Sequence, residues 1–172
     1  MPSTRFSRPS WPNWRSPTRR TAGSLIFRNG TLVGSKLLGQ DFTGDAYFHP
    51  RPSAAGGGYD PTASGASNLG PTNPDLVTAV RNRSVEYRDA NGLAPGAPVP
   101  VDAVTASASG LDPHISVANA RIQARRVATA RHLPLARVLD LVNSHTKNRL
   151  FGFLGEKTVN VFELNLALDA MK

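Results

Sequence analysis

The side chains that could carry out hydrolysis gather in one short segment between positions 107 and 116. This segment contains the nucleophile, acid and base types of a hydrolase triad: Ser107, Ser109, Asp112, His114 and Ser116. Triads are assembled in space from separate segments, and no Gly-x-Ser-x-Gly turn supports a nucleophile here. We therefore expect no catalytic residue. We expect instead a turn whose polar side chains hydrogen-bond to the backbone.

Metal chemistry is also unsupported by the residue types and their spacing. His49, His114, His132 and His145 lack the i, i+4 pairing and the carboxylate pattern of a zinc site, and the chain has no cysteine. We expect no bound metal and no disulfide.

Phosphate binding has more substance, because residues 65–72 have the glycine spacing and terminal threonine of a P-loop. A helix follows, and its first amide groups could hold an anion. The phosphate-neutralising lysine is missing, however, Pro71 stands in its place, and no strand precedes the loop. These departures argue against a nucleotide hydrolase that works alone.

A nucleotide contact shared with another chain is a second interpretation of the same loop. Residues 64–67, Ser-Gly-Ala-Ser, are loosely similar to the Ser-Gly signature that ABC-type ATPases present to a nucleotide held mainly by another subunit. The candidate nucleotide-binding residues are Ser64, Gly65, Ser67 and Asn68. The alternative is a glycine-rich turn that packs tightly and binds nothing.

This loop is part of a longer stretch, residues 51–74, that is dense in glycine, proline and asparagine. Loops of more than about a dozen residues without secondary structure usually bind or cover something. Tyr59, Leu69 and the Asp-Pro and Gly-Pro turns favour a fixed conformation over a flexible linker. We expect a contact surface for a partner, with these candidate residues: Arg51, Pro52, Tyr59, Asp60 and Asn73.

From Ser24 the chain has the pattern of one mixed α/β domain, a small β-hairpin and sheet with three to four helices. Strands at 24–28 and 31–35 flank Asn29-Gly30, the dipeptide that best supplies a type I′ turn. Asn73 and Pro74 predict the start of a helix that ends at Asn91-Gly92 and turns Leu76, Val77 and Val80 towards the core. Residues 101–106 are expected to form a strand.

Three further elements follow Ser116, which should cap a helix reaching about His132 with Ile115, Ala118 and Ile122 on one side. Its arginines, 121, 125, 126 and 131, indicate either a solvated basic face or a contact for an acidic partner or phosphate. Pro134 starts a core helix that contains Leu135, Val138, Leu139 and Val142. Asn160 and Glu163 form a capping box for a terminal helix, although the alternation from Phe162 to Leu168 would also suit a strand.

Composition limits the architecture to one domain and places the excess charge at one end. The chain has 172 residues, is 40% hydrophobic and carries a formal charge of +8. Residues 1–30 hold six arginines and no acid, which leaves 14 basic and 12 acidic side chains, or +2, in the rest. With Trp11 and Trp14, such an arm could bind nucleic acid, lie at a membrane surface, or be a solvated tail.

Long motifs in order along the chain resemble the C subunit of the Kdp-type potassium-transporting ATPase of bacteria. They lie at residues 23–26, 34–40, 47–56, 57–74, 100–116, 126–131, 159–161 and 164–169, and the range from the first motif to the last covers most of the sequence. The resemblance identifies the chain as a member of that family, with a globular domain at residues 23–172.

What the resemblance implies is a non-catalytic accessory subunit of ATP-driven, high-affinity potassium uptake. Its partners would be the A, B and F subunits at the bacterial inner membrane, and it would bind no nucleic acid. The family is inferred to act as a chaperone that raises the ATP affinity of the B subunit, so the one cofactor implied is ATP shared with that subunit. The bulk of the C subunit is placed outside the membrane, whereas ATP is cytoplasmic, so this coupling would need a distant two-state element. An alternative role is a structural cap on the extracytoplasmic face of the A subunit.

The amino-terminal segment departs from the family pattern. Family members begin with one membrane-spanning helix, but residues 1–22 are rich in Arg, Pro, Ser and Thr and have no apolar run near the ~20 residues that a span needs. We interpret these residues as a frameshifted or misassigned start that stands where the helix would be. Reading the upstream nucleotides in the other two frames tests this.

Overall fold

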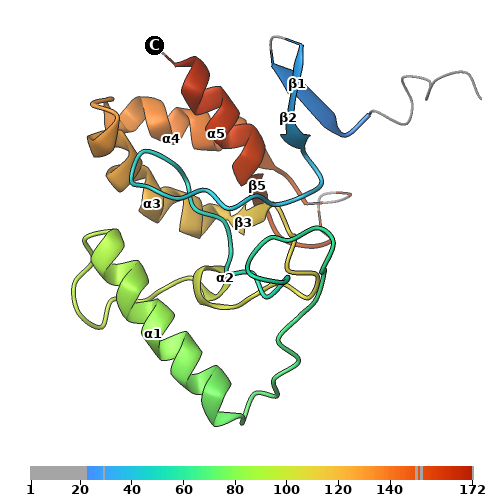
Figure 1. Ribbon diagram of the computed structural model, residues 1–172. Coiled ribbons are helices and arrows are strands. Elements are labelled where there is room, and N and C mark those ends of the chain that lie inside the picture. The colour runs from blue at the N-terminus through green and yellow to red at the C-terminus, as the bar shows by residue number, and fades with distance from the viewer. Residues whose placement is uncertain (1–22, 29, 150, 152, 172) are drawn as a thin grey trace, which may run out of the picture.

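The computed structural model describes residues 23–28, 30–149, 151 and 153–171. The predictions for residues 1–22 therefore lie outside the described part of the chain. In that part, five helices and two small antiparallel sheets form a mixed α/β fold, as predicted (Figure 1). None of its helices combines the length and the apolar character needed to cross a bilayer.

Short strands and helices are interspersed along the chain. Their bounds are β1 Leu25–Arg28, β2 Thr31–Ser35, α1 Pro74–Ala90, α2 Val101–Val104, β3 His114–Ser116, α3 Val117–Ala130, α4 Leu135–Ser144, β4 Thr146–Lys147, β5 Thr158–Asn160 and α5 Val161–Ala170. β1 pairs with β2, and β5 lies between β3 and β4, with all pairs antiparallel. The small second sheet thus joins segments that precede α3, follow α4 and lead into α5.

Capping residues start three of the helices where the sequence predicted. The Asn73 side chain accepts a hydrogen bond from the Asp75 amide, and Pro74 takes the first helical position of α1. Ser116 accepts from the Asn119 amide at the start of α3, and Asn160 accepts from the Glu163 amide at the start of α5. Each cap satisfies a backbone donor that the helix leaves unpaired. The alternative of a terminal strand over Phe162–Leu168 is wrong.

The predicted β1–β2 hairpin is confirmed, with Gly30 at a φ of 78° in its turn. A register shift between Ile26 and Phe27 bends the pair, as a β-bulge does. The hairpin contacts the rest of the described chain where Gln40 donates to the Val33 carbonyl and where Arg28 forms an ion pair of 3.6 Å with Asp169 of α5. The hairpin is therefore attached to the carboxyl-terminal helix.

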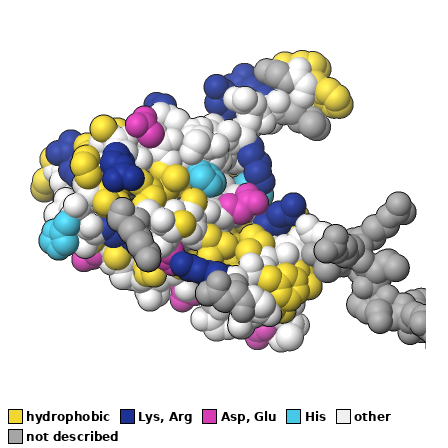
Figure 2. Space-filling model, turned by 90° about the horizontal axis from the view of Figure 1, so that it is seen from above, with side chains coloured by type: hydrophobic (Ala, Val, Ile, Leu, Met, Phe, Trp, Pro, Cys, Tyr) yellow, Lys and Arg dark blue, Asp and Glu magenta, His cyan; other side chains and the backbone are white. Residues whose placement is uncertain are grey.

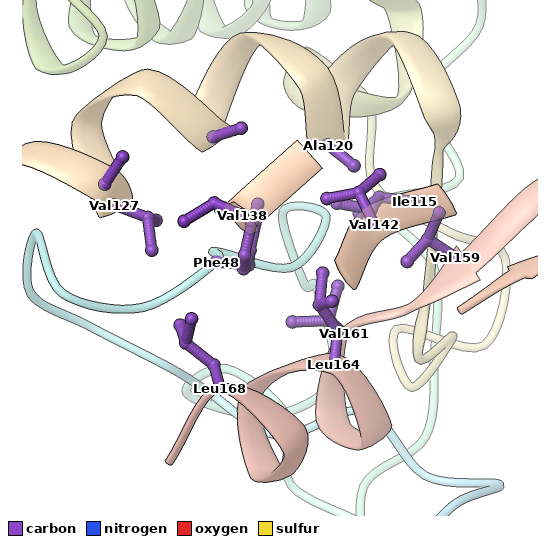
Figure 3. Close-up of a cluster of buried hydrophobic side chains, with 12 residues drawn as sticks. Phe48, Ile115, Ala120, Val127, Val138, Val142, Val159, Val161, Leu164 and Leu168 are labelled. Carbon is purple, nitrogen blue, oxygen red and sulfur yellow. The ribbon is translucent and has the colours of Figure 1, made fainter. Parts of the chain in front are cut away.

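The hydrophobic core lies between α3, α4 and α5, with the second sheet at one end (Figure 3). Phe48 is the largest side chain in it and comes from the long segment between β2 and α1 that runs through this space. Val138 and Val142 of α4 are fully buried as predicted, and Leu139 packs against the same cluster, whereas Leu135 is 37% exposed at its edge. An irregular segment thus supplies the central side chain of a helical core.

Two predictions about the middle of the chain are wrong. Residues 101–104 form the short helix α2 and not a strand, and the Thr105 hydroxyl donates to the Val101 carbonyl at its end. α1 has no buried residue, so Leu76, Val77 and Val80 do not face the core. The amino-terminal half of α1 extends away from the other helices, where no core is within reach (Figure 1).

The buried face of α3 also differs from the predicted one. Ala118 is exposed and Ile122 only partly buried, while Asn119, Gln123 and Val127 are buried. Apolar spacing pointed to the wrong side because two amide side chains lie on the inner face.

The surface of the molecule also exposes hydrophobic side chains beside Lys and Arg side chains, as the right of Figure 2 shows.

Candidate functional site

A cleft of 470 Å³ opens between the segment 41–59, α1 and α3. Polar side chains from all three segments line it, including His49, Tyr87, Asn119 and Gln123. The same side chains also hold the irregular segment 41–59 on the helices. Their hydrogen bonds therefore determine which polar groups of the cleft are already paired.

Two buried amide side chains bind consecutive residues of the irregular segment in the way that a neighbouring strand would. The Phe48 amide donates to Asn165 Oδ1 and the Phe48 carbonyl accepts from Asn165 Nδ2, both at 2.9 Å. On the next residue, the His49 amide donates to Gln123 Oε1 at 2.7 Å and the His49 carbonyl accepts from Gln123 Nε2 at 3.1 Å. Asn165 of α5 and Gln123 of α3 thereby satisfy backbone groups that would otherwise be buried without partners.

The amide contacts continue from α3 to α1 and α2. Gln123 Nε2 also donates to Asn119 Oδ1 at 2.8 Å, and the Tyr87 hydroxyl of α1 donates to the same oxygen at 2.8 Å. Asn119 Nδ2 in turn donates to Asp102 of α2 at 3.0 Å. Burial raises the pKa of the Tyr87 hydroxyl, so this group stays protonated and remains a donor. One connected polar network therefore positions α1 and α2 on α3.

Asp102 reinforces the start of α3 from outside that helix. Its carboxylate accepts from the Ser116 amide at 2.7 Å and from the Ser116 hydroxyl at 2.8 Å, besides the bond from Asn119. A negative charge near a helix amino terminus is favourable because the helix dipole is positive there. Because residues 101–106 were expected to form a strand, the sequence did not predict this role of Asp102.

Arg126 is a structural residue and not part of a solvated basic face. Its side chain is 6% exposed, and its guanidinium donates to Gln123 Oε1 at 2.9 Å and to the Gly44 and Asp45 carbonyls at 3.2 and 2.9 Å. Burial lowers its pKa below the ordinary value for arginine, although arginine remains charged at neutral pH. Its charge is used to fix the backbone of the segment 44–45.

The other arginines of this helix divide in the same way. Arg131 donates to Asp169 at 2.7 Å and lies 4.7 Å from the centre of the Tyr47 ring. Arg121 and Arg125 are exposed. The expected solvated face therefore holds for two of the four arginines.

His49 lies at the edge of the cleft with its ring pointing to backbone. Its Nε2 donates to the Gly44 carbonyl at 2.8 Å, which places the proton on that nitrogen, while Arg126 Nη1 lies 3.3 Å away. Burial lowers the pKa of the ring, the bond to Gly44 opposes that shift, and the Arg126 charge adds to it. His49 is thus a neutral hydrogen-bond donor near pH 7.

The predicted partner-contact residues are mostly occupied with contacts inside the molecule. Arg51 donates to Asp112 at 3.3 Å, and the Tyr59 hydroxyl donates to the Arg51 carbonyl. Pro52 lines the cleft, and Asn73 caps α1. Asp60 accepts from the Thr62 hydroxyl and amide, which lowers the pKa of its carboxyl. The structure thus brings Arg51, Pro52 and Tyr59 together and leaves Asn73 at the far end of the loop.

The candidate nucleotide residues divide into an anchored pair and an exposed pair. The Ser64 hydroxyl and the Gly65 amide both donate to the Ser109 carbonyl, at 2.9 and 3.0 Å. Ser67 and Asn68 are exposed, and Asn68 has a φ of 53°. The anchored pair is therefore already hydrogen-bonded, although Ser64 is exposed, and the exposed pair Ser67 and Asn68 is accessible to another molecule.

Gly110 allows this anchoring, because the loop backbone passes directly over it. Its φ is 69°, and a Cβ at this position would lie 2.7 Å from the Ala55 amide nitrogen and 2.9 Å from the Gly65 carbonyl oxygen. Only glycine fits that approach without a shift of backbone.

The segment 107–116 is the polar turn that the sequence predicted. Ser107 accepts from the Asp112 amide, Ser109 from the Leu111 amide, and Asp112 from the His114 amide, at 3.4, 3.1 and 3.0 Å. Burial works against ionisation of Asp112, but hydrogen bonds from the ring and amide of His114 and the charges of His114 and Arg51 lower its pKa. In the described ranges no three residues of the His, Cys, Asp or Glu type are grouped as metal ligands.

Four residues of this network, Asp102, Asn119, Gln123 and Asn165, were not identified from the sequence. Asn119 and Gln123 are spaced i, i+4 on a helix that is otherwise rich in alanine and valine, and this spacing was the available signal. Asn165 lies within an apolar run, and a single amide in such a run also indicates a buried polar contact.

These contacts make the network a structural feature of the mixed α/β domain, because its buried polar side chains hold the backbone and the helices in place. The chain belongs to the family described as the K+-transporting ATPase c chain, whose model matches residues 16–170. The resemblance seen in the motifs is thereby confirmed.

Curated relatives agree with this assignment over most of their length. Proteins named "Potassium-transporting ATPase KdpC subunit" from Mycobacterium tuberculosis and Kineococcus radiotolerans are 56% and 58% identical over 149 residues, which is 87% of this chain and 79% and 76% of the relatives. The protein of that name from Rhodospirillum rubrum is 59% identical over 147 residues, 86% of this chain and 76% of its own length.

Proposed function

We propose that this chain is a non-catalytic subunit that assists assembly of a potassium-transporting ATPase and raises the ATP affinity of its catalytic B subunit. The observation that carries the proposal is the family match over residues 16–170. The exposed pair Ser67 and Asn68, held on an anchored loop, is the surface that would contact a neighbouring subunit, and its effect on ATP across the membrane would be transmitted through that subunit. The partners in this proposal are the A, B and F subunits at the inner membrane, with the bulk of the domain on the extracytoplasmic side.

A second candidate function is a structural cap on the extracytoplasmic face of the A subunit. The loop 51–73 favours it, because Ser53 Oγ donates to the Gly110 carbonyl at 2.7 Å and Ser64 Oγ donates to the Ser109 carbonyl. A loop fixed at both of these points presents its exposed residues in one arrangement, and pre-ordering lowers the cost of binding a partner. Such a surface suits a permanent contact between subunits.

The two functions are separated by changing the exposed pair while the anchors stay intact. The test variant carries Ser67→Ala and Asn68→Gly, since glycine keeps the positive φ at position 68. The control is Thr78→Ala on the exposed side of α1. Each protein is co-expressed with the other subunits, purified from a membrane extract, and assayed for subunit content and for ATP affinity.

The outcomes distinguish the proposals. Weaker ATP affinity in a normally assembled complex supports the first function. Loss of assembly with normal nucleotide behaviour of the remaining subunits supports the cap. If the test variant matches Thr78→Ala in both measurements, neither function uses this pair. Failure of the unchanged chain to co-purify with the A and B subunits would contradict both.

A further inference from the structure

The loop between β4 and β5 carries the most exposed aromatic side chains of the described chain. Phe151 is 79% exposed, Phe153 is 71% exposed and Leu154 is 49% exposed. Large apolar side chains that are grouped at the surface usually mark a site of interaction. Nothing in the contacts of the cleft or of the 51–73 loop makes use of them.

Basic residues flank this apolar group on both sides in the sequence. Lys147 and Arg149 precede it and Lys157 follows it, with Glu156 as the only acid between positions 147 and 157, so the segment carries a net charge of +2 (three basic less one acidic). Lys147 lies 3.6 Å from Glu163 and is half exposed, while Arg149 and Lys157 are exposed. Apolar tip and cationic flanks thus occur in one short loop.

The loop is held at its base, because Thr146 pairs with Val159 and Lys147 with Thr158 across β4 and β5. Phe151 adopts a φ of 53°, the left-handed region that a bulky residue rarely enters. The paired base therefore fixes where the loop leaves the domain, and the side chains of Phe151, Phe153 and Leu154 are exposed beyond it.

We propose that the β4–β5 loop inserts Phe151, Phe153 and Leu154 into the interface of a lipid bilayer that contains anionic headgroups. Aromatic and aliphatic side chains at a bilayer interface lose their contact with water, and neighbouring Lys and Arg side chains are attracted to anionic lipid. Charge complementarity selects this occupant over an uncharged apolar surface. The contact is additional to the proposed subunit function, since it requires only this chain and a membrane.

The β1–β2 hairpin supplies a matched control. It also exposes apolar side chains, namely Leu25 at 40%, Phe27 at 56% and Leu32 at 52%. Its neighbouring Arg28 is engaged with Asp169 of α5. The hairpin therefore resembles the loop in exposed apolar character but has less free positive charge beside it.

The absence of cysteine allows a single probe to report on the loop. We would attach an environment-sensitive fluorophore to Phe153→Cys in the full chain, and to Thr62→Cys, which lies in an exposed part of the 51–73 loop. Each labelled protein is mixed with vesicles of phosphatidylcholine alone or with 30% phosphatidylglycerol, a composition chosen for the test. We expect a blue shift at position 153 with the anionic vesicles, a smaller one with the neutral vesicles, and none at position 62.

A second measurement needs no label and guards against disturbance by the probe. Co-sedimentation of Phe151→Ser, Leu154→Ser with anionic vesicles should be weakened roughly tenfold relative to the unchanged chain. Phe27→Ser, Leu32→Ser should bind like the unchanged chain. Urea unfolding of both double variants verifies that they are folded, which exposed positions should permit.

Three results would overturn the proposal. One is equal vesicle binding by the unchanged chain and the loop variant, and another is a probe at position 153 that stays in water while the protein sediments with vesicles. Both would assign lipid binding to other residues, including the arginines of residues 1–22. The third is a blue shift that occurs only when a purified A subunit is added, which would make the occupant a protein. Because the vesicles contain no other subunit, failure here leaves the proposed subunit function intact.

Discussion

Asn165 and Gln123 each form, with a single side chain, the pair of backbone hydrogen bonds that a neighbouring strand would form. A side-chain amide has N–H donors and a carbonyl acceptor side by side, so it can pair with both polar groups of one backbone residue. Phe48 and His49 receive this pairing from two different helices. The irregular segment can therefore cross the core without a neighbouring strand.

Asn165→Leu should strongly lower the free energy of unfolding. The substitution keeps the branched shape of the side chain but leaves the Phe48 amide and carbonyl buried without partners, which costs roughly 2–6 kcal/mol for the two groups. Asn143→Leu is the control, because Asn143 is exposed and its side chain accepts a hydrogen bond from the exposed Arg121. Urea unfolding followed by circular dichroism measures both, and equal midpoints would show that the pairing contributes nothing.

His49 makes stability depend on pH in a defined direction. Because burial lowers its pKa below the ordinary 6.5, the unfolded chain binds a proton here more readily than the folded chain does. This contribution is fully present above about pH 6.5 and is lost as the pH falls from there towards the folded pKa. Urea midpoints should therefore decrease between pH 7.5 and 5.5.

The contribution of His49 is isolated with two variants. His49→Gln should flatten the pH dependence over that interval. His132→Asn, at an exposed position with a φ of 55° that asparagine tolerates, should leave it unchanged. A slope that persists in His49→Gln would assign the effect to another group.

At the scale of elements, local signals in the sequence predicted the boundaries well. The Asn-Gly turn of β1–β2 and the caps Asn73, Ser116 and Asn160 each act within a few residues, so the sequence contains both partners of each interaction. The polar network could not be predicted in the same way. Gln123 meets a backbone 74 residues away, and Asn165 one 117 residues away.

The wrong predictions have the same physical origin. Apolar spacing identifies the inner face of a helix only if the core is apolar, and α3 turns Asn119 and Gln123 inward. Residues 101–104 suit a strand by composition, but Asp102 is required at the start of α3 and α2 presents it there. Within the 51–73 loop, the sequence identified a fixed conformation but not which residues would face inward.

Asp102→Ala should weaken the junction between α2 and α3. It removes three hydrogen bonds to a charged acceptor at the beginning of α3, and we expect a loss of about 2–3 kcal/mol. Asp89→Ala, in the exposed part of α1, should change stability by less than about 0.5 kcal/mol. Chemical unfolding of the two variants side by side tests this, and similar stabilities would contradict the assigned role of Asp102.

At the scale of the whole molecule, the chain before residue 61 and the chain after residue 100 are fastened at several points. Asn165 and Gln123 hold Phe48 and His49, Arg126 holds the carbonyls of residues 44–45, and Arg131 donates to the Ala46 carbonyl at 2.6 Å. None of these contacts involves residues 61–72, which form the exposed part of the loop.

The amide pairing has a consequence for covalent continuity: the peptide bonds of that exposed loop are dispensable once the domain has folded. A chain cut between Asn68 and Leu69 should elute as one species from a sizing column and separate into two fragments in urea. Immediate separation of the fragments in native buffer would show that the covalent link through the loop, and not the hydrogen bonds, holds the two parts together. If the cut protein holds together, the two fragments, produced independently, should find each other and rebuild the domain, so that this subunit could be supplied as a pair of peptides.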